Sequence, residues 1–311
     1  MIHMESFFAS VTSSFEKLGN DFSQAVDKLG SDYNRSANSE RRQETARKTG
    51  IVSERNTGLT VFPTYVCDLG DKAKVVDLGG NKINTVPEDI RNLTRVQKLN
   101  LAANALTEIP QSLCLGMGNL KVLRLEKNGL LKVPLVIGSL VKLEELWLAD
   151  NKLTQLPPSV SQLQRLRILN LARNELVERL SRDDDEKDVA DAKNFSGVEY
   201  LGYCANLTSL TLDGNAGFET LPPSLGGLAK LKTLSCDATS VQSVPKEVFK
   251  GCTALTFLSL KRCPVNVNEL RLTPGFAEFD ARRVQSRNKQ IAGNVFSDGD
   301  DLLGDNDNKR R

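Results

Sequence analysis

Few side chains in this sequence could combine in acid–base or nucleophilic chemistry. The chain has one histidine, His3, so a Ser-His-Asp or Cys-His site has no base outside the N-terminal stretch. There is no GxxxxGKS or GxxxxGKT phosphate loop and no GxGxxG motif, and "GMGNL" at Gly116 is too short to cradle a phosphate. We therefore expect no catalytic residues, no cofactor and no metal site, and we interpret the protein as non-enzymatic.

Cysteine is the remaining reactive side chain. The six thiols form no CxxC pair; they are Cys67, Cys114, Cys204, Cys236, Cys252 and Cys263. The start, "MIHMESFF", lacks the basic region and apolar core of a secretory signal. We therefore expect reduced thiols in a cytoplasmic protein, because disulfides persist mainly in oxidising compartments.

Charge favours no large polyanionic partner. The formal net charge is +2, which gives no global attraction for nucleic acid, and no run approaches the 18 apolar residues of a membrane span. The densest charge run is "SRDDDEKDVADAK", residues 181–193. A solvated loop is its simplest interpretation. An acidic lip that contacts a basic partner is the alternative, and the spacing does not match an EF-hand.

A regular series of asparagines organises the chain. They are spaced by 23, 24, 23 and 23 residues and are Asn81, Asn104, Asn128, Asn151 and Asn174. Apolar residues stand three and five positions before each asparagine and two positions after it. This frame, LxxLxLxxNxL, is the leucine-rich repeat.

Each part of the frame has a mechanical role. The alternating leucines predict a short strand with one buried face, and the asparagine amide can bond backbone groups left unpaired by the turn. Stacked copies bury a shared core, which predicts an α/β solenoid: a right-handed horseshoe with a parallel concave sheet and about eight repeats. The frame resumes after an insertion placed at residues 177–206, with Thr239 and Cys263 in place of asparagine. Because Glu54 interrupts the strand pattern, "GLTVFP" (residues 58–63) is interpreted as an N-terminal cap.

The concave face of the predicted sheet carries the candidate binding site. The frame points Trp147, the single tryptophan, outward, and neighbouring strands place Arg124 and Asn170 beside it. An aromatic anchor among charged residues is typical of a binding hot spot. A Trp147–Arg124 stack without any partner is the alternative interpretation. The same rule adds further outward or rim residues: Lys98, Glu145, Ile168, Lys127, Asp150 and Arg173, with Asp77 and Asn100 also pointing outward.

The two ends of the repeat region resemble a known family. "QETARKTGIVSERNTGLTVFP" (residues 43–63) looks like the N-terminal cap of small intracellular leucine-rich-repeat proteins, the leucine-rich-repeat-containing protein 57 type. "CTALTFLSLKRCPV" and "GFAEFDARRVQSRNKQI" are similar to the C-terminal cap of its plant members. The resemblance implies a cytoplasmic, non-enzymatic protein. More distantly, the repeats resemble Ras-pathway scaffolds and plant Ras-group proteins, which implies a small-GTPase pathway by analogy.

An apolar stripe with the helix period precedes the repeats. Its members are Phe8, Val11, Phe15, Leu18, Phe22, Val26, Leu29 and Tyr33. The resembled family begins Met-Gly, a myristoylation signal, whereas residue 2 here is Ile. Three roles stay open for this stripe: docking on a protein partner, binding a membrane surface through residues 4–33, or capping the solenoid. Residues 1–33 carry five acids against two lysines, which favours protein over lipid.

These patterns divide the chain into three parts. We expect an amphipathic helical extension over residues 1–40, a repeat domain with its caps over 41–292, and a disordered tail over 293–311. The predicted function is a protein-binding scaffold whose partners are proteins and not nucleic acid. A peripheral membrane adaptor is the alternative.

Overall fold

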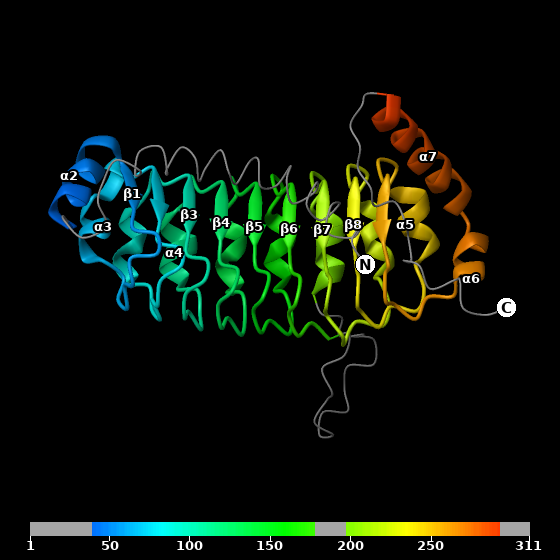
Figure 1. Ribbon diagram of the computed structural model, residues 1–311, viewed down its shortest axis with the longest axis horizontal. Coiled ribbons are helices and arrows are strands. Elements are labelled where there is room, and N and C mark those ends of the chain that lie inside the picture. The colour runs from blue at the N-terminus through cyan, green and yellow to red at the C-terminus, as the bar shows by residue number, and fades with distance from the viewer. Residues whose placement is uncertain (1–38, 178–196, 293–311) are drawn as a thin grey trace, which may run out of the picture.

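Nine short parallel strands follow one another in a single sheet, in chain order from β1 to β9 (Figure 1). The computed structural model describes residues 39–177 and 197–292. The strands are β1 (Ile51–Ser53), β2 (Val75–Asp77), β3 (Lys98–Asn100), β4 (Val122–Arg124), β5 (Glu145–Trp147), β6 (Ile168–Asn170), β7 (Ser209–Thr211), β8 (Thr233–Ser235) and β9 (Phe257–Ser259). This arrangement confirms the predicted α/β solenoid.

Helices cover one face of the sheet, and no helix among residues 39–177 and 197–292 covers the other, which we call the open face (Figure 1). The α-helices are α2 (Ser39–Thr49), α3 (Thr64–Asp68), α4 (Gln111–Gly116), α5 (Lys246–Gly251), α6 (Val267–Leu272) and α7 (Phe276–Ala292). The 3-10 helices are η1 (Gly70–Lys72), η2 (Glu88–Asn92), η3 (Leu135–Ser139), η4 (Pro158–Gln162), η5 (Val198–Tyr203) and η6 (Pro223–Gly227). The frame leucines fill the layer between helices and sheet, so each repeat buries its core against its neighbours.

The asparagines form the expected ladder of hydrogen bonds. Asn151 Nδ2 donates to the carbonyls of Leu125 and Leu148, and its Oδ1 accepts from the N–H of Leu130. The same three bonds recur at Asn104, Asn128, Asn174 and Asn215, with only small changes in distance. Thr239 Oγ1 and Cys263 Sγ replace the amide near the C-terminus, and both donate to the Cys236 carbonyl.

The residue before each ladder position has a left-handed backbone. The non-glycine examples are Asn56, Ala103, Lys127, Asp150, Arg173, Ala238 and Arg262, with φ between 52° and 60°. A side chain in this conformation costs about 1 kcal/mol, so the turn is imposed by the neighbouring repeats. The repeat geometry therefore fixes the backbone positions from which the side chains of Lys127, Asp150 and Arg173 project at the rim.

The N-terminal end differs from the sequence expectation. Residues 51–53 form β1, a ninth strand, where a cap without a strand was predicted, and β1 pairs in register with β2. Glu54 takes the buried position that Leu78 holds in the next repeat, with 3% of its surface exposed. An ion pair with Arg42 of α2 (2.9 Å) balances its charge, and Tyr65 of α3 donates a hydrogen bond to it (3.0 Å). These partners from two helices offset the cost of burying a carboxylate directly after the strand.

An aromatic cluster closes the C-terminal end. The rings of Phe249, Phe276 and Phe279 lie within 5.8 Å of one another and join α5 to α7. Arg282 of α7 donates to the carbonyls of Leu255 and Phe249, at 3.4 and 3.5 Å. Helix α7 therefore covers the last repeat, whose core would otherwise face solvent.

Several expectations fall outside the described residues. The apolar stripe of residues 8–33, the acidic run 181–193 and the tail 293–311 all lie there. The expected insertion, 177–206, includes η5, which packs between η4 and η6 as in an ordinary repeat. Only residues 178–196 of that range lack a described structure.

Candidate protein-binding face

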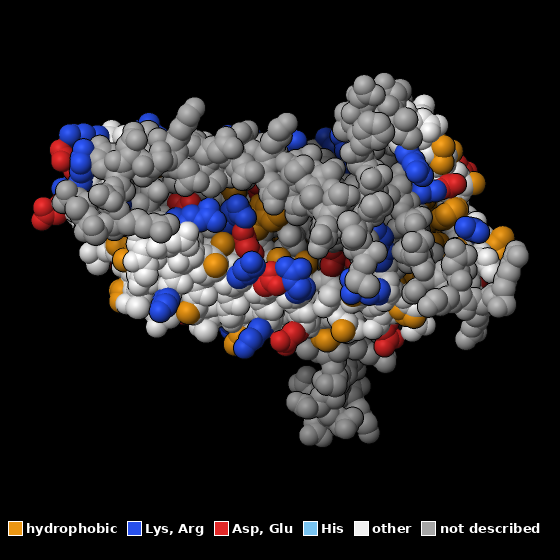
Figure 2. All heavy atoms as spheres, viewed as in Figure 1, with side chains coloured by type: hydrophobic (Ala, Val, Ile, Leu, Met, Phe, Trp, Pro, Cys, Tyr) orange, Lys and Arg blue, Asp and Glu red, His pale blue; other side chains and the backbone are white. Residues whose placement is uncertain are grey.

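Basic, acidic and hydrophobic side chains lie together near the middle of the face that Figure 2 shows. The register places Arg124 of β4 and Asn170 of β6 on either side of Trp147 of β5, as the sequence predicted. Lys98, Glu145 and Ile168 stand two positions earlier, at the first residue of their strands. All of these side chains except Asn170 and Ile168 are charged or aromatic, and all are half-buried.

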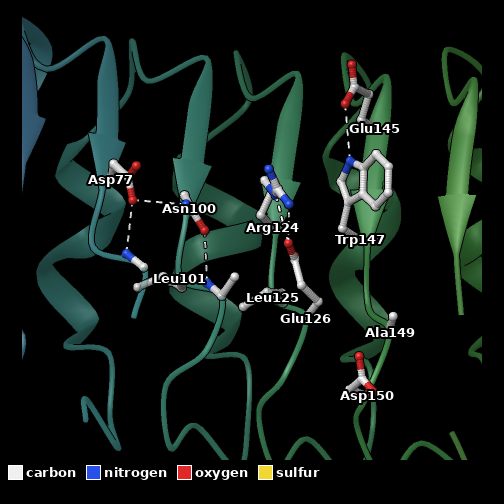
Figure 3. Close-up of polar contacts among 12 residues, drawn as sticks. Asp77, Asn100, Leu101, Arg124, Leu125, Glu126, Glu145, Trp147, Ala149 and Asp150 are labelled. Atoms are coloured by element: carbon white, nitrogen blue, oxygen red, sulfur yellow. Dashed lines mark hydrogen bonds and ion pairs between the residues drawn. The ribbon is translucent and has the colours of Figure 1, made fainter. Parts of the chain in front are cut away.

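Trp147 is held by neighbours on two sides (Figure 3). The Arg124 guanidinium carbon lies 5.5 Å from the centre of its ring, within cation–π distance. Its indole Nε1 donates to Glu145 Oε2 at 3.1 Å. The predicted Trp147–Arg124 stack is therefore present, and these contacts restrict the rotamers of the indole.

Glu126 orients the arginine in turn. Arg124 Nε donates to Glu126 Oε1 at 2.8 Å, and Arg124 Nη2 forms an ion pair with the same oxygen. Glu126 Oε2 is buried and has no hydrogen-bond partner among the described residues. Since buried polar atoms are nearly always hydrogen-bonded, an unsatisfied acceptor stands out on the residue that orients Arg124. The repeat frame alone does not indicate this oxygen, because its burial depends on the side chains packed around it.

A bidentate ion pair forms the rim of this face. Arg173 Nη2 donates to Asp150 Oδ2 at 2.6 Å, and Arg173 Nε donates to Asp150 Oδ1. Hydrogen bonding to Arg173 lowers the pKa of Asp150, because it favours the carboxylate. Lys127, the third predicted rim residue, lies exposed beside them. The central and rim residues of the predicted site are thus brought together.

Two residues expected to point into solvent are buried instead. Asp77 and Asn100 are 0% and 3% exposed, and Asp77 Oδ1 accepts from Asn100 Nδ2 at 2.9 Å (Figure 3). Asp77 Oδ1 also accepts from the N–H of Gly79, and Asn100 Oδ1 accepts from that of Ala102. Burial raises the pKa of Asp77. These residues therefore bond to each other and to the turns, and Asp77 Oδ2 is buried without a hydrogen-bond partner among the described residues.

A second carboxylate network extends over the C-terminal strands. Asp213 Oδ1 accepts from Ser235 Oγ at 2.7 Å and from the N–H of Asp237 at 2.8 Å. Asp237 Oδ1 repeats the pattern with Ser259 and Lys261. Burial, the largest influence, raises the pKa of Asp213 to about 6.

Asp213 should make stability depend on pH. Because its folded-state pKa lies above the ordinary value, the folded chain binds the proton more tightly than the unfolded chain. The contribution of Asp213 to the unfolding free energy is fully present below about pH 4, and it is lost as the pH rises through about 6. Asp213→Asn keeps the Oδ1 acceptor, so it should raise the unfolding free energy by about 2 kcal/mol at pH 7.5.

Denaturant unfolding at pH 4 and pH 7.5 measures this effect. The exposed residue Asp71 supplies the control, and Asp71→Asn should change stability by less than about 0.5 kcal/mol at either pH. Equal pH dependence in the native chain and Asp213→Asn would contradict the assignment.

Residues 39–177 and 197–292 contain no group of three or more His, Cys, Asp or Glu able to hold a metal ion, and no helix among them could cross a membrane. All six cysteines are free, and burial raises the pKa of Cys67 and Cys204 to about 11. Such thiols are weak nucleophiles.

A groove lies away from the open face, among the proline-containing return segments. Its volume is about 1140 Å³. Exposed Leu115 and Leu135 line it, together with Pro110, Pro134 and Pro157.

The fold and its asparagine ladder define a leucine-rich-repeat solenoid. Residues 141–182 match the family model described as leucine-rich repeats in two copies. Over 86 residues, 27% of this chain, the sequence is 36% identical to plant intracellular Ras-group-related LRR protein 7 of Oryza sativa subsp. japonica. The chain aligns with only 33% of that protein's length. The finer resemblance to the leucine-rich-repeat-containing protein 57 type stays a prediction.

Two solved structures share the fold. A leucine-rich-repeat protein of Leptospira interrogans, LIC12759, has a TM-score of 0.59 and 24% identity over 78% of this chain and 61% of its own. The ectodomain of the Arabidopsis thaliana receptor kinase GASSHO1/SCHENGEN3 has a TM-score of 0.55 and 26% identity, covering 66% of this chain and 23% of its own. That ectodomain was solved in complex with CASPARIAN STRIP INTEGRITY FACTOR 2.

Proposed function

We propose that this protein is a non-catalytic interaction module that binds a protein partner on the open face around Trp147. The partner site comprises Trp147 with Arg124 and Asn170, and around them Lys98, Glu145, Ile168, Lys127, Asp150 and Arg173. The observation that carries the proposal is the fixed arrangement of Trp147 between Arg124 and Glu145. Side chains already held in place lose less entropy on binding, which favours affinity.

The polar groups of the face favour a partner that offers hydrogen-bond donors. Glu126 Oε2 is a buried acceptor without a partner among the described residues, and a donor from a bound chain would satisfy it. The complex of the GASSHO1/SCHENGEN3 ectodomain supports this mode of binding by analogy. The partial similarity to a plant Ras-group-related protein makes small GTPases a partner class to test first.

Replacing Trp147 with alanine should weaken partner binding without changing thermal stability. A truncated hot spot costs 2 kcal/mol or more, so we expect the dissociation constant to rise about 30-fold. Proteins found by proximity labelling with the full chain in cells would be purified and titrated against both forms. An unchanged affinity for every one of them would reject the proposed site.

Tyr203→Ala is the matched control. Tyr203 is an aromatic residue of η5 that is 66% exposed and stands away from the open face. Its side chain makes no hydrogen bond with a described residue, so its loss should leave both stability and partner affinity unchanged. Equal losses for Tyr203→Ala and Trp147→Ala would place the binding site elsewhere.

A further inference from the structure

The edge of the sheet where the strands begin is strongly basic. The four residues directly before each of the strands β2 to β8 include nine basic side chains and only two acids, Asp71 and Glu144. The nine, called the basic rim below, are Lys72, Lys74, Arg95, Lys121, Lys142, Arg165, Arg167, Lys230 and Lys232. The four residues after each of the same strands have the contrary balance, with two bases and four acids. The positive charge therefore belongs to one edge of the sheet and not to the whole surface.

Backbone hydrogen bonds stack the basic rim into two rows. The N–H of Gln97 donates to the Lys74 carbonyl, and the equivalent bond recurs from each repeat to the next as far as Thr256. One row stands directly before the strands, and the other stands two residues earlier. Between them, the rows place at least one basic side chain before every strand from β2 to β8 except β7. At about 4.8 Å per strand, they extend about 29 Å along the sheet.

Most of the basic rim lacks a countercharge within the described residues. Lys142 and Lys230 donate to neutral asparagine amides, both at 2.6 Å. Lys121 faces an acid, Glu144, but at 3.8 Å. The other six members are exposed and form no ion pair with any described residue; they are Lys72, Lys74, Arg95, Arg165, Arg167 and Lys232.

Mutual repulsion within the rim favours an acidic occupant. Members in neighbouring repeats stand about 5 to 10 Å apart, which is close to the screening length of about 8 Å at physiological salt, so their repulsion is only partly screened. A polyanion laid along the rows relieves this repulsion and is attracted by several cations at once. The edge therefore suits a partner that carries its own row of negative charges.

The side chains around the two rows favour an acidic protein segment over nucleic acid or a membrane. None of the four residues before any of these strands is aromatic, so a single strand of nucleic acid would find no ring on which to stack its bases. Val141 is the one exposed large apolar side chain among them. A surface that lies on a membrane gains much of its affinity by burying apolar area, which this edge does not offer.

We propose that the basic rim is a second binding surface, which takes an acidic helix of a partner protein lying across the strands. Acids on one face of a helix recur about every 5.4 Å, close to the distance of about 4.8 Å between strands. An extended segment places alternate side chains about 6.8 Å apart, so it falls out of step with the rows within about two repeats. Five turns of helix extend about 27 Å and match the length of the rows. No member of the rim belongs to the site around Trp147, so binding here does not depend on the proposed function.

Titration of an acidic peptide with the full chain tests this docking. The probe is a fluorescein-labelled, alanine-rich helix of about 18 residues with one glutamate per turn on a single face, followed by fluorescence anisotropy. The triple variant Lys74→Glu, Arg167→Glu and Lys232→Glu should raise the dissociation constant at least about 10-fold. The circular dichroism and melting temperature of the solenoid should be retained, because all three side chains are exposed. A probe with lysines in place of the glutamates should bind this variant at least about 10-fold more tightly than it binds the native chain.

Three exposed lysines that follow ladder residues supply the matched control, the variant Lys82→Glu, Lys132→Glu and Lys152→Glu. It changes the net charge by the same amount and should keep the affinity for the acidic probe. A peptide of the same composition with its glutamates spread around the helix should bind about 5-fold more weakly, because fewer of them face the rim. Equal affinity of the two triple variants, or of the two acidic peptides, overturns the proposal. A loss in Trp147→Ala as large as that in the rim variant would place the helix on the open face and also overturns it.

Three further results would overturn the proposal. The first is the absence of detectable binding between the acidic probe and the native chain at low salt. The second is flotation of the native chain, but not of the rim variant, with phosphatidylcholine–phosphatidylserine vesicles, which would assign the rim to a membrane. The third is tighter binding of an oligothymidylate than of the acidic probe, lost in the rim variant, which would assign the rim to nucleic acid.

Discussion

Replacing Asn151 with alanine should lower the free energy of unfolding by about 3 kcal/mol. The substitution leaves the buried N–H of Leu130 without a partner among the described residues, and the carbonyls of Leu125 and Leu148 each lose one of two bonds, since Asn128 and Asn174 still donate to them. An unpaired buried donor costs about 1–3 kcal/mol, and each further hydrogen bond lost costs about 0.5–1.5 kcal/mol. The effect is large because one amide joins two adjacent repeats, and the interfaces between repeats carry the stability of a solenoid.

Equilibrium denaturation followed by circular dichroism measures this loss. Asn84→Ala is the control, since Asn84 is exposed and makes only a 3.4 Å contact with Thr85. It should change the unfolding free energy by less than about 0.5 kcal/mol. Asn151→Asp should be at least as harmful as alanine, because it removes both Nδ2 donors and buries a charge. Similar midpoints for Asn84→Ala and Asn151→Ala would show that the ladder contributes little.

Replacing Gly251 with alanine should cost about 3 kcal/mol. A Cβ at Gly251 would lie 2.0 Å from the carbonyl oxygen of Gly226 and 2.7 Å from its carbonyl carbon. Both atoms are backbone of the preceding repeat, so no side-chain rotation can relieve the contact. The two repeats, which meet through α5 and η6, would have to separate, and a close-packed core resists this.

The comparison with Gly118→Ala isolates this steric effect. A Cβ at Gly118 meets no atom within 4 Å, and its φ lies outside the left-handed region. Alanine there should be neutral or slightly stabilising, because it reduces the freedom of the unfolded chain. A melting temperature for Gly251→Ala equal to that of Gly118→Ala would mean that the repeats are not packed as described.

The repeat frame predicted most of the fold because each of its residues acts locally. The spacing of Asn81 to Asn174 set the register of five strands, and the structure pairs them as expected. The frame failed at Glu54, where a charged residue takes a leucine position within a regular repeat. Its partners Arg42 and Tyr65 come from separate helices, so the local pattern could not reveal the compensation.

The sequence predicted where the residues of the candidate site stand on the strands, but it did not predict the contacts between their side chains. Strand alternation placed Trp147 between Arg124 and Asn170. It did not indicate that Glu126 orients Arg124, or that Asp77 and Asn100 bond to each other instead of pointing into solvent. Such choices depend on which neighbouring side chain lies within hydrogen-bond distance, which the frame does not specify.

The sequence by itself therefore determined the architecture, the asparagine ladder and the column in which each open-face residue stands. A fixed period of about 23 residues is sufficient for this, because every repeat meets only its neighbours. Only the tertiary structure showed which charges are paired and which are not. Lys74, Arg167 and Lys232, which form no ion pair with a described residue, are spread over about 160 residues of sequence. They stand in one column at the edge of the sheet only because the repeats stack.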